Sequence, residues 1–191
     1  MFTHERLAVE RGPESGFPII VAVHSTVLGQ AIGGCRVATY PDWRDGVADA
    51  LRLSAAMTEK AALAGLPHGG GKTVIALPPG AVKSPAALRD AGALIESLGG
   101  GYATGPDVGT GPDDMVTIGE RTRHVFCRPP EAGGSGDSSP ATAAGTIAAL
   151  RAVLAHRFGD ASPAGGSPCW GWAGSASGWP GCSPRPAPSW W

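Results

Sequence analysis

Apolar residues recur along the chain in short continuous runs and in helical periodicity, and this pattern predicts alternating strands and helices. Residues 18–25 form a continuous apolar run, which is typical of a buried strand. A second strand is expected over residues 30–40 and another over residues 73–77. Between them, residues 43–62 have the pattern of a helix that begins after Asp42, a residue type that caps helix N-termini.

The same alternation continues in the second half of the chain. Ser84-Pro85 combines an N-cap residue with proline at the first helical position, and predicts a helix that ends near Leu98. A brief strand is expected over residues 102–104, a helix from Pro112, and a long helix over residues 141–158. Strands that alternate with helices in this way predict an α/β fold with a largely buried sheet.

Length and charge narrow the class of protein. A chain of 191 residues with net charge -1 suits one globular domain or slightly more, and it has no global attraction for nucleic acid. No uncharged apolar run reaches the length that spans a bilayer, so no membrane partner is expected. The first eleven residues are charged and lack a signal-peptide core, so we expect a cytoplasmic protein. The cysteines and histidines have no spacing that suits zinc, so we expect no metal.

Composition changes abruptly near residue 160. Residues 161–191 contain no Leu, Ile, Val, Met or Phe, yet five of the six Trp lie there. A segment without branched aliphatic side chains cannot build a packed core, so we expect it to be disordered. The sequence therefore predicts an ordered domain over residues 1–160 and a Gly/Pro/Ser/Trp-rich tail over residues 161–191.

Two lysines fall among glycine-rich segments that suit a small-molecule site. Lys60 and Lys72 lie near the Gly33-Gly34 pair, the glycines at 69–71 and the loop around Asp107. Glycine lets a substrate lie directly against main-chain N–H groups. A desolvated lysine has a lowered pKa and serves as a base, a second lysine can hold a carboxylate, and an aspartate can be the partner acid. A lysine after glycines is also compatible with a solvated strand end, and spacing alone leaves both interpretations open.

These candidates belong to a longer series of motifs between residues 28 and 143. The series consists of Leu28-Gly29-x-Ala31-x-Gly33-Gly34-Cys35-Arg36, Asp49-Ala50-Leu51-Arg52-Leu53, Met57-Thr58-x-Lys60, residues 68–75 (HGGGKTVI), residues 107–110 with 113–115, and residues 134–143 (GSGDSSPATA). In this order the series resembles the N-terminal domain of the leucine/phenylalanine/valine (Glu/Leu/Phe/Val) amino-acid dehydrogenases. The resemblance covers roughly residues 5 to 160. Asp137 departs from it, because the family usually has asparagine there.

The resemblance implies a fold and an activity. The fold is a mixed sheet flanked by helices, in a substrate-binding and oligomerisation domain of a homo-oligomeric enzyme. The activity is NAD-dependent oxidative deamination of a branched-chain or aromatic L-amino acid to its 2-oxo acid and ammonia. The resemblance makes Lys72 the lysine that activates water and Asp107 the proton shuttle to the amino group. The other implied ligand contacts are Gly33, Gly34, Met57 and Lys60 on the amino acid, with Lys60 at its carboxylate, and Ser139 and Thr142 near the nicotinamide.

The tail lies where the family has a nucleotide-binding domain that opens with a strand and G-x-G-x-x-G. Tryptophan has a single codon, TGG, so parts of a neighbouring reading frame follow from the residues at 169–173, Cys-Trp-Gly-Trp-Ala. Joining the last base of each codon to the first two of the next gives Leu-Gly-(Leu/Met/Val)-Gly. The following residues allow the pattern to be completed as G-x-G-x-x-G. We therefore hypothesise that the chain from about residue 159–161 onward is a frame-shifted reading of an NAD-binding domain.

Under this hypothesis the chain alone would not catalyse the full reaction, since no segment would hold the cofactor. The alternative is a non-catalytic amino-acid-binding or assembly module that retains the substrate cleft. A genuine Gly/Pro/Ser/Trp tail is the alternative to the frameshift.

The nucleotide sequence of the gene tests the frameshift hypothesis. We expect the overlapping frame to be open opposite residues 161–191 and to encode G-x-G-x-x-G. The same frame must give alanine at the Trp179-Pro180 junction and valine at Trp190-Trp191. A stop codon within that frame, or the absence of the glycine pattern, would sink the hypothesis.

Overall fold

The computed structural model describes residues 3–158, and these fall into two units. The first unit ends at Asp137 and contains the sheet. The second begins at Ser138 and its described part holds helix α4 (Ser139–Phe158). The predicted boundary near residue 160, the tail over residues 161–191 and the frame-shifted segment all lie outside the described residues.

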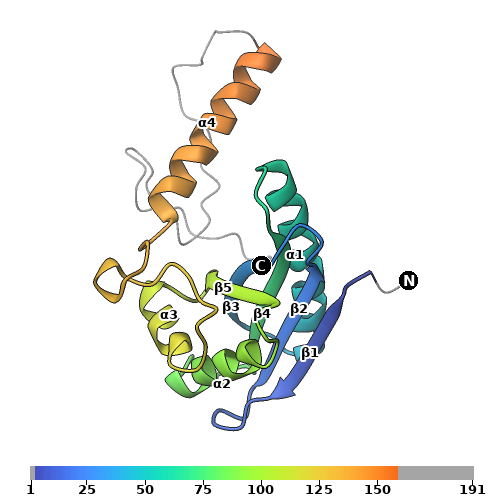
Figure 1. Ribbon diagram of the computed structural model, residues 1–191, viewed down its shortest axis with the longest axis vertical. Coiled ribbons are helices and arrows are strands. Elements are labelled where there is room, and N and C mark those ends of the chain that lie inside the picture. The colour runs from blue at the N-terminus through green and yellow to red at the C-terminus, as the bar shows by residue number, and fades with distance from the viewer. Residues whose placement is uncertain (1–2, 159–191) are drawn as a thin grey trace. The chain divides into compact units, whose positions relative to one another are not determined.

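A five-stranded mixed sheet with the order β1-β2-β4-β3-β5 forms the centre of the first unit (Figure 1). Strand β2 pairs antiparallel with both of its neighbours, whereas β3 pairs parallel with β4 and with β5. The carboxyl ends of β3, β4 and β5 therefore lie at the same edge of the sheet. The strands are β1 (Arg6–Arg11), β2 (Pro18–Ser25), β3 (Ala31–Thr39), β4 (Gly69–Leu77) and β5 (Tyr102–Pro106).

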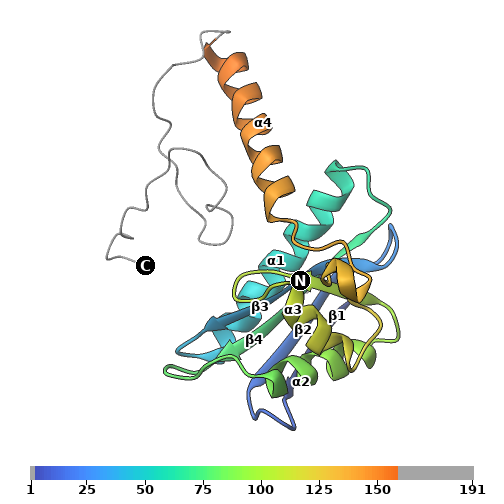
Figure 2. The ribbon, with the colours of Figure 1, turned by 90° about the vertical axis from the view of Figure 1, so that its left-hand side faces the viewer.

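Helices cover both faces of this sheet, as Figures 1 and 2 show. Helix α1 (Trp43–Leu63) packs on one face against β2 and β4, and α2 (Pro85–Glu96) and α3 (Pro112–Gly119) pack on the other. Because side chains alternate along a strand, β2 and β4 contribute to two separate cores. Ile20 and Val74 are buried under α1, whereas Ile19 and Ile75 are buried with α2. A short 3-10 helix, η1 (Pro130–Ala132), precedes the second unit.

The predicted α/β fold is confirmed, and most predicted elements lie where the pattern indicated. Asp42 and Ser84 cap the helices that follow them, through bonds from the Arg44 and Ala87 backbone N–H groups. The strand expected at residues 73–77 is longer and begins at Gly69, so the glycine run is part of the strand rather than its entry loop.

Close packing explains why glycine occupies these positions of the strand. Gly71 lies against the Tyr102 ring, where a Cβ atom would collide with it.

The apolar pattern gave no signal for β1, an edge strand whose side chains are mostly exposed.

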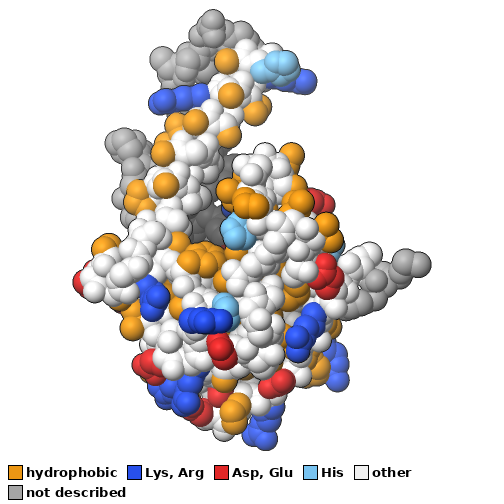
Figure 3. Space-filling view, in the orientation of Figure 1, with side chains coloured by type: hydrophobic (Ala, Val, Ile, Leu, Met, Phe, Trp, Pro, Cys, Tyr) orange, Lys and Arg blue, Asp and Glu red, His pale blue; other side chains and the backbone are white. Residues whose placement is uncertain are grey.

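Charges of both signs are interspersed on the surface over α2, α3 and the β1–β2 hairpin (Figure 3). Glu14 in the hairpin pairs with Arg89 of α2 and with Arg121 after α3. Along α4, apolar side chains such as Leu150 and Val153 are exposed. Among the described residues, no helix has the length and apolar character needed to cross a membrane.

A buried carboxylate ties the β1–β2 hairpin to α2. Asp90 is 3% exposed and accepts hydrogen bonds from the backbone N–H groups of Glu14 (3.1 Å) and Ser15 (2.8 Å). It also accepts one from the Ser15 hydroxyl at 2.6 Å. Three donors to one buried carboxylate compensate for its loss of hydration.

Replacement of this carboxylate should therefore be costly. We expect Asp90→Ala to lower the free energy of unfolding by about 2–4 kcal/mol, because it leaves buried donors without an acceptor. Urea denaturation followed by circular dichroism measures the change. Glu59→Ala, which removes an exposed carboxylate on α1, serves as the control and should change stability by less than about 0.5 kcal/mol. Equal effects of the two substitutions would contradict the anchoring role of Asp90.

Candidate active site

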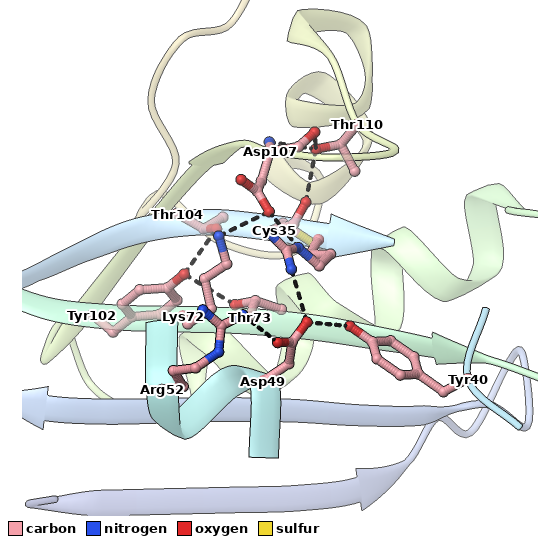
Figure 4. Close-up of polar contacts among 11 residues, drawn as sticks. Cys35, Tyr40, Asp49, Arg52, Lys72, Thr73, Tyr102, Thr104, Asp107 and Thr110 are labelled. Carbon is pink, nitrogen blue, oxygen red and sulfur yellow. Dashed lines mark hydrogen bonds and ion pairs between the residues drawn. The ribbon is translucent and has the colours of Figure 1, made fainter. Parts of the chain in front are cut away.

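The parallel strands bring the two predicted catalytic residues into contact. Lys72 lies on β4 and Asp107 directly follows β5, with β3 between them in the sheet. Lys72 Nζ is 2.8 Å from Asp107 Oδ2, and Lys72 is only 4% exposed (Figure 4). The lysine is therefore a buried, ion-paired group and not a solvated strand end.

Glycines in the intervening strands allow this contact. The pairing of Cys35 with Thr73 and of Gly34 with Gly105 sets Lys72, Gly34 and Gly105 in one row across the sheet. A Cβ atom on Gly34 would lie 2.6 Å from Asp107 Cβ and 2.8 Å from the Pro106 carbonyl oxygen. The absence of a side chain at Gly34 thus lets Asp107 settle over β3 within reach of Lys72.

Gly33 is required for a different contact. Its missing Cβ would point to the opposite face and collide with the carbonyl oxygen of Gly71, so this glycine permits the close pairing of β3 with β4. Both members of the Gly33-Gly34 pair are thus explained by packing, and their predicted contact with a substrate stays a prediction.

Arg36 forms a second ion pair with the same aspartate, and sequence reasoning did not assign it a role. Its Nε donates to Asp107 Oδ2 at 2.9 Å, and its Nη1 donates to Asp49 Oδ2 at 2.8 Å. Asp49 lies on α1 and also accepts from the Tyr40 hydroxyl and from Arg52. This network links α1, β3 and the end of β5 (Figure 4).

The turn after β5 is docked on β3, which fixes the backbone of Asp107. The Asp107 N–H donates to Thr110 Oγ1 at 2.9 Å, and the Thr110 hydroxyl donates to the Cys35 carbonyl at 2.8 Å. Gly109 has φ +82°, a left-handed conformation that glycine adopts without strain. A Cβ atom at Gly109 would also collide with the Val37 carbonyl oxygen, so this turn can lie against β3 only with glycine at this position.

Burial and charge act in opposite directions on the pair. Burial lowers the pKa of Lys72, and the attraction of Asp107 offsets this only in part, so the pKa stays below its ordinary value. Burial alone would raise the pKa of Asp107, but the charges and hydrogen bonds of Lys72 and Arg36 outweigh it and hold the pKa low. The pair therefore offers an ionised carboxylate next to a lysine whose amine gives up its proton more readily than in water.

The neighbouring Cys35 is not part of this chemistry. Its thiol is fully buried, and burial raises its pKa to about 12. A thiol in that state is not a nucleophile at neutral pH.

Met57 and Lys60 lie near the C-terminal end of α1, which crosses β4 closely at Gly70. A Cβ atom on Gly70 would collide with the backbone of α1 at Thr58. Met57 is half-buried and Lys60 is exposed, and Lys60 has no ion-pair partner among the described residues. The helix is thus held against the strand that carries Lys72, but a shared substrate contact of Met57 and Lys60 stays a prediction.

Ser139 and Thr142 lie at the beginning of α4, in the second unit. The two units are described separately, so the predicted proximity of these residues to the nicotinamide stays a prediction.

A cavity of about 380 Å³ opens along β3 and β5. Ile32 of β3 and Ala103 of β5, which pair in the sheet, form part of its wall. By the alternation of strands they share a face with Gly34 and Asp107. The Phe126 ring contributes to the wall and also lies against Gly105. The remaining lining residues are Gln30, His68, Arg123, His124 and Val125.

The beginning of α3 does not fit the pyrophosphate of NAD. The glycine-rich turn after β5 leads into α3, as a phosphate-binding turn would, but the Gly111 N–H there already donates to Asp114 Oδ2 at 2.8 Å. Asp113 adds a second negative charge in the same helical turn, which opposes a pyrophosphate. Nor do the described His, Cys, Asp and Glu side chains form a group of three or more that could hold a metal ion.

Comparison with known proteins shows which family has this sequence and fold. The family model described as the Glu/Leu/Phe/Val dehydrogenase dimerisation domain matches residues 3–124. The chain is 44% identical over 159 residues to valine dehydrogenase of Streptomyces virginiae and 44% identical over 162 residues to phenylalanine dehydrogenase of Lysinibacillus sphaericus. These alignments cover 83% and 85% of this chain but 44% and 42% of the relatives, so the chain spans less than half of their length.

A solved structure agrees with these relatives. L-tryptophan dehydrogenase from Nostoc punctiforme matches with a TM-score of 0.64 at 36% identity, over 82% of this chain and 43% of that one. The family match covers most of the first unit, including Lys72, Asp107 and the network around them. The chain therefore belongs to the Glu/Leu/Phe/Val dehydrogenase family of amino-acid oxidoreductases.

Proposed function

We propose that this chain supplies the substrate-binding and proton-transferring part of an NAD-dependent oxidative deamination of an apolar L-amino acid to its 2-oxo acid and ammonia. The observation that carries the proposal is the buried ion pair of Lys72 with Asp107, reached across Gly34. The relatives named above are dehydrogenases of valine, phenylalanine and tryptophan, which supports an apolar or aromatic substrate.

The two residues take different protons in this proposal. Asp107 is ionised and accepts a proton from the substrate ammonium group, which must become neutral before the carbon–hydrogen bond is oxidised. Lys72, whose pKa is lowered, gives up its proton more readily than a lysine in water, and as the free amine it would accept a proton from the water that attacks the oxidised carbon. Neighbouring groups with pKa values displaced from their ordinary values suit such paired acid and base steps.

The remaining predicted residues would hold the substrate. Lys60, exposed at the end of α1, would pair with the substrate carboxylate, and Met57 would line the site beside it. The backbone at Gly33 and Gly34 would lie against the substrate. The cavity along β3 and β5, with Ile32, Ala103 and Phe126 in its wall, would receive an apolar side chain.

The pyrophosphate of the oxidant would be held elsewhere than at the beginning of α3, which does not fit it. In the proposed complete enzyme, Ser139 and Thr142 would approach the nicotinamide, and the first unit would assemble with other copies, as the description of the matched domain indicates for the family. A cytoplasmic location belongs to the same proposal.

A second candidate function is a non-catalytic module that binds an amino acid or assembles with other subunits. The crowded, acidic beginning of α3 favours it, because the sheet edge that carries the site offers no cofactor cradle among the described residues. This module would keep the substrate contacts without turnover.

Calorimetry of the full chain tests the proposal. L-leucine, L-valine, L-phenylalanine and their 2-oxo acids would be titrated with and without NAD, and absorbance at 340 nm would report turnover. We expect binding of at least one apolar ligand, weakened tenfold or more by Lys72→Met. Arg89→Met is the matched control, because Arg89 is a cation on α2 that pairs with Glu14 and Glu120 and contacts no residue of the site, and it should change the Kd by less than about twofold.

The outcomes separate the candidates. Turnover with NAD excludes the non-catalytic module, and binding of an apolar amino acid or 2-oxo acid that depends on Lys72 supports the proposed function. A folded chain that binds none of these ligands, or one in which Arg89→Met weakens binding as much as Lys72→Met, contradicts the proposed function.

A further inference from the structure

Arg36 connects two carboxylates that approach it from different elements. Its Nε donates to Asp107 Oδ2, at the end of β5, and its Nη1 donates to Asp49 Oδ2, on α1. The side chain is 12% exposed, so neither bond competes freely with water. Only a guanidinium, with donors in a fixed planar fork, makes both bonds at once from one position on β3.

Asp49 is a fixed anchor for this arginine. Its Oδ2 also accepts from the Tyr40 hydroxyl at 2.9 Å, and its Oδ1 accepts from Arg52 Nη2 at 2.7 Å. Burial and the negative charge of Asp49 raise the pKa of Tyr40 to about 12, so the phenol stays a donor at neutral pH. Three donors, two at Oδ2 and one at Oδ1, therefore hold the carboxylate of Asp49 in one orientation.

Both cations at Asp107 bind the same oxygen. Lys72 Nζ lies 2.8 Å and Arg36 Nε lies 2.9 Å from Oδ2. Among the described residues no donor reaches the other oxygen, Oδ1. The carboxylate is thus held by one oxygen while the other is left to accept a hydrogen bond from a ligand.

We propose that Arg36 is a positioning residue of the site: anchored by Asp49, it turns Asp107 so that Oδ2 faces the two cations and Oδ1 faces the bound substrate's amino group. The identity of the group at Oδ1 rests on the proposed function, whereas the effect of Arg36 on Lys72 and Asp107 does not. Sharing one carboxylate between two cations also leaves Lys72 with an incomplete counter-charge, which favours its neutral form.

The charges around Lys72 give the sign of this effect. Asp107 raises the pKa of Lys72, and Arg36 lowers it. On α1, Asp49 and Arg52 form an ion pair, so their charges largely cancel. Cys35 on β3 is uncharged at neutral pH. Loss of Arg36 therefore removes a repelling cation from Lys72 and leaves Asp107 to Lys72 alone. Both changes favour the protonated lysine.

Competitive labelling of the full chain measures this effect without any ligand. The chain has three lysines, so acetic anhydride labelling between pH 6 and 10, read by mass spectrometry, gives a separate pH profile for Lys60, Lys72 and Lys83. In Arg36→Gln we expect the midpoint of Lys72 to move to higher pH, with at least a threefold lower relative reactivity at pH 8. The profiles of Lys60 and Lys83 should not change.

Arg36→Lys separates charge from position. It keeps a cation near Lys72, so the midpoint of Lys72 should stay close to that of the unmodified chain. It cannot bridge Asp107 and Asp49, so the affinity for the apolar amino acid should fall about as far as in Arg36→Gln. Asp49→Asn keeps Arg36 and removes the charge of its anchor, and should weaken amino-acid binding severalfold with the fold intact; it replaces Arg36→Gln if that variant does not fold.

A purely structural role would lower stability and leave the Lys72 profile unchanged in Arg36→Gln, and this result would overturn the proposal. Full amino-acid affinity in both Arg36→Lys and Asp49→Asn would also overturn it. If the unmodified chain binds no amino acid, the proposed function fails, while the labelling result still decides the effect of Arg36 on Lys72.

Discussion

The contact between Lys72 and Asp107 depends on glycine at the position between them on β3, where any side chain would separate the two residues. Lys72 and Asp107 are separated by β3, and a side chain at Gly34 would keep the aspartate away from the lysine. Two further glycines allow close packing around the site. Gly33 lets β3 pair closely with β4, and Gly70 lets α1 pack closely on β4. Sheet register and glycine placement together bring two charged groups from distant parts of the chain within hydrogen-bond distance.

A buried lysine is tolerated here because its desolvation is compensated by a partner fixed in place. Removing one member of a buried pair typically costs on the order of 3–5 kcal/mol, since the remaining charge has no counter-ion. The turn at Thr110 and the bridge through Arg36 hold Asp107 on two sides, so the lysine meets an ordered carboxylate. The same order that makes burial tolerable gives the pair a defined orientation for proton transfer.

The sequence predicted the fold class and most elements because apolar runs such as residues 18–25 and the capping residues Asp42 and Ser84 act locally. It missed β1, whose polar edge position leaves no apolar alternation, and it began β4 too late, because glycine carries no hydrophobic signal. Lys72 and Asp107 were found through glycine context and family resemblance. The bridge made by Arg36 depends on strand order, which no local pattern contains.

Every residue of the Lys72–Asp107–Arg36–Asp49 network, and every strand that supports it, lies in the first unit. During translation the first unit is made before α4, and domains generally fold as units with the N-terminal one first. The ion pairs of the site use side chains of the first unit alone. A change of sequence beyond residue 137 therefore replaces the segment that follows the site, whereas the charged residues of the site and the strands that position them stay the same.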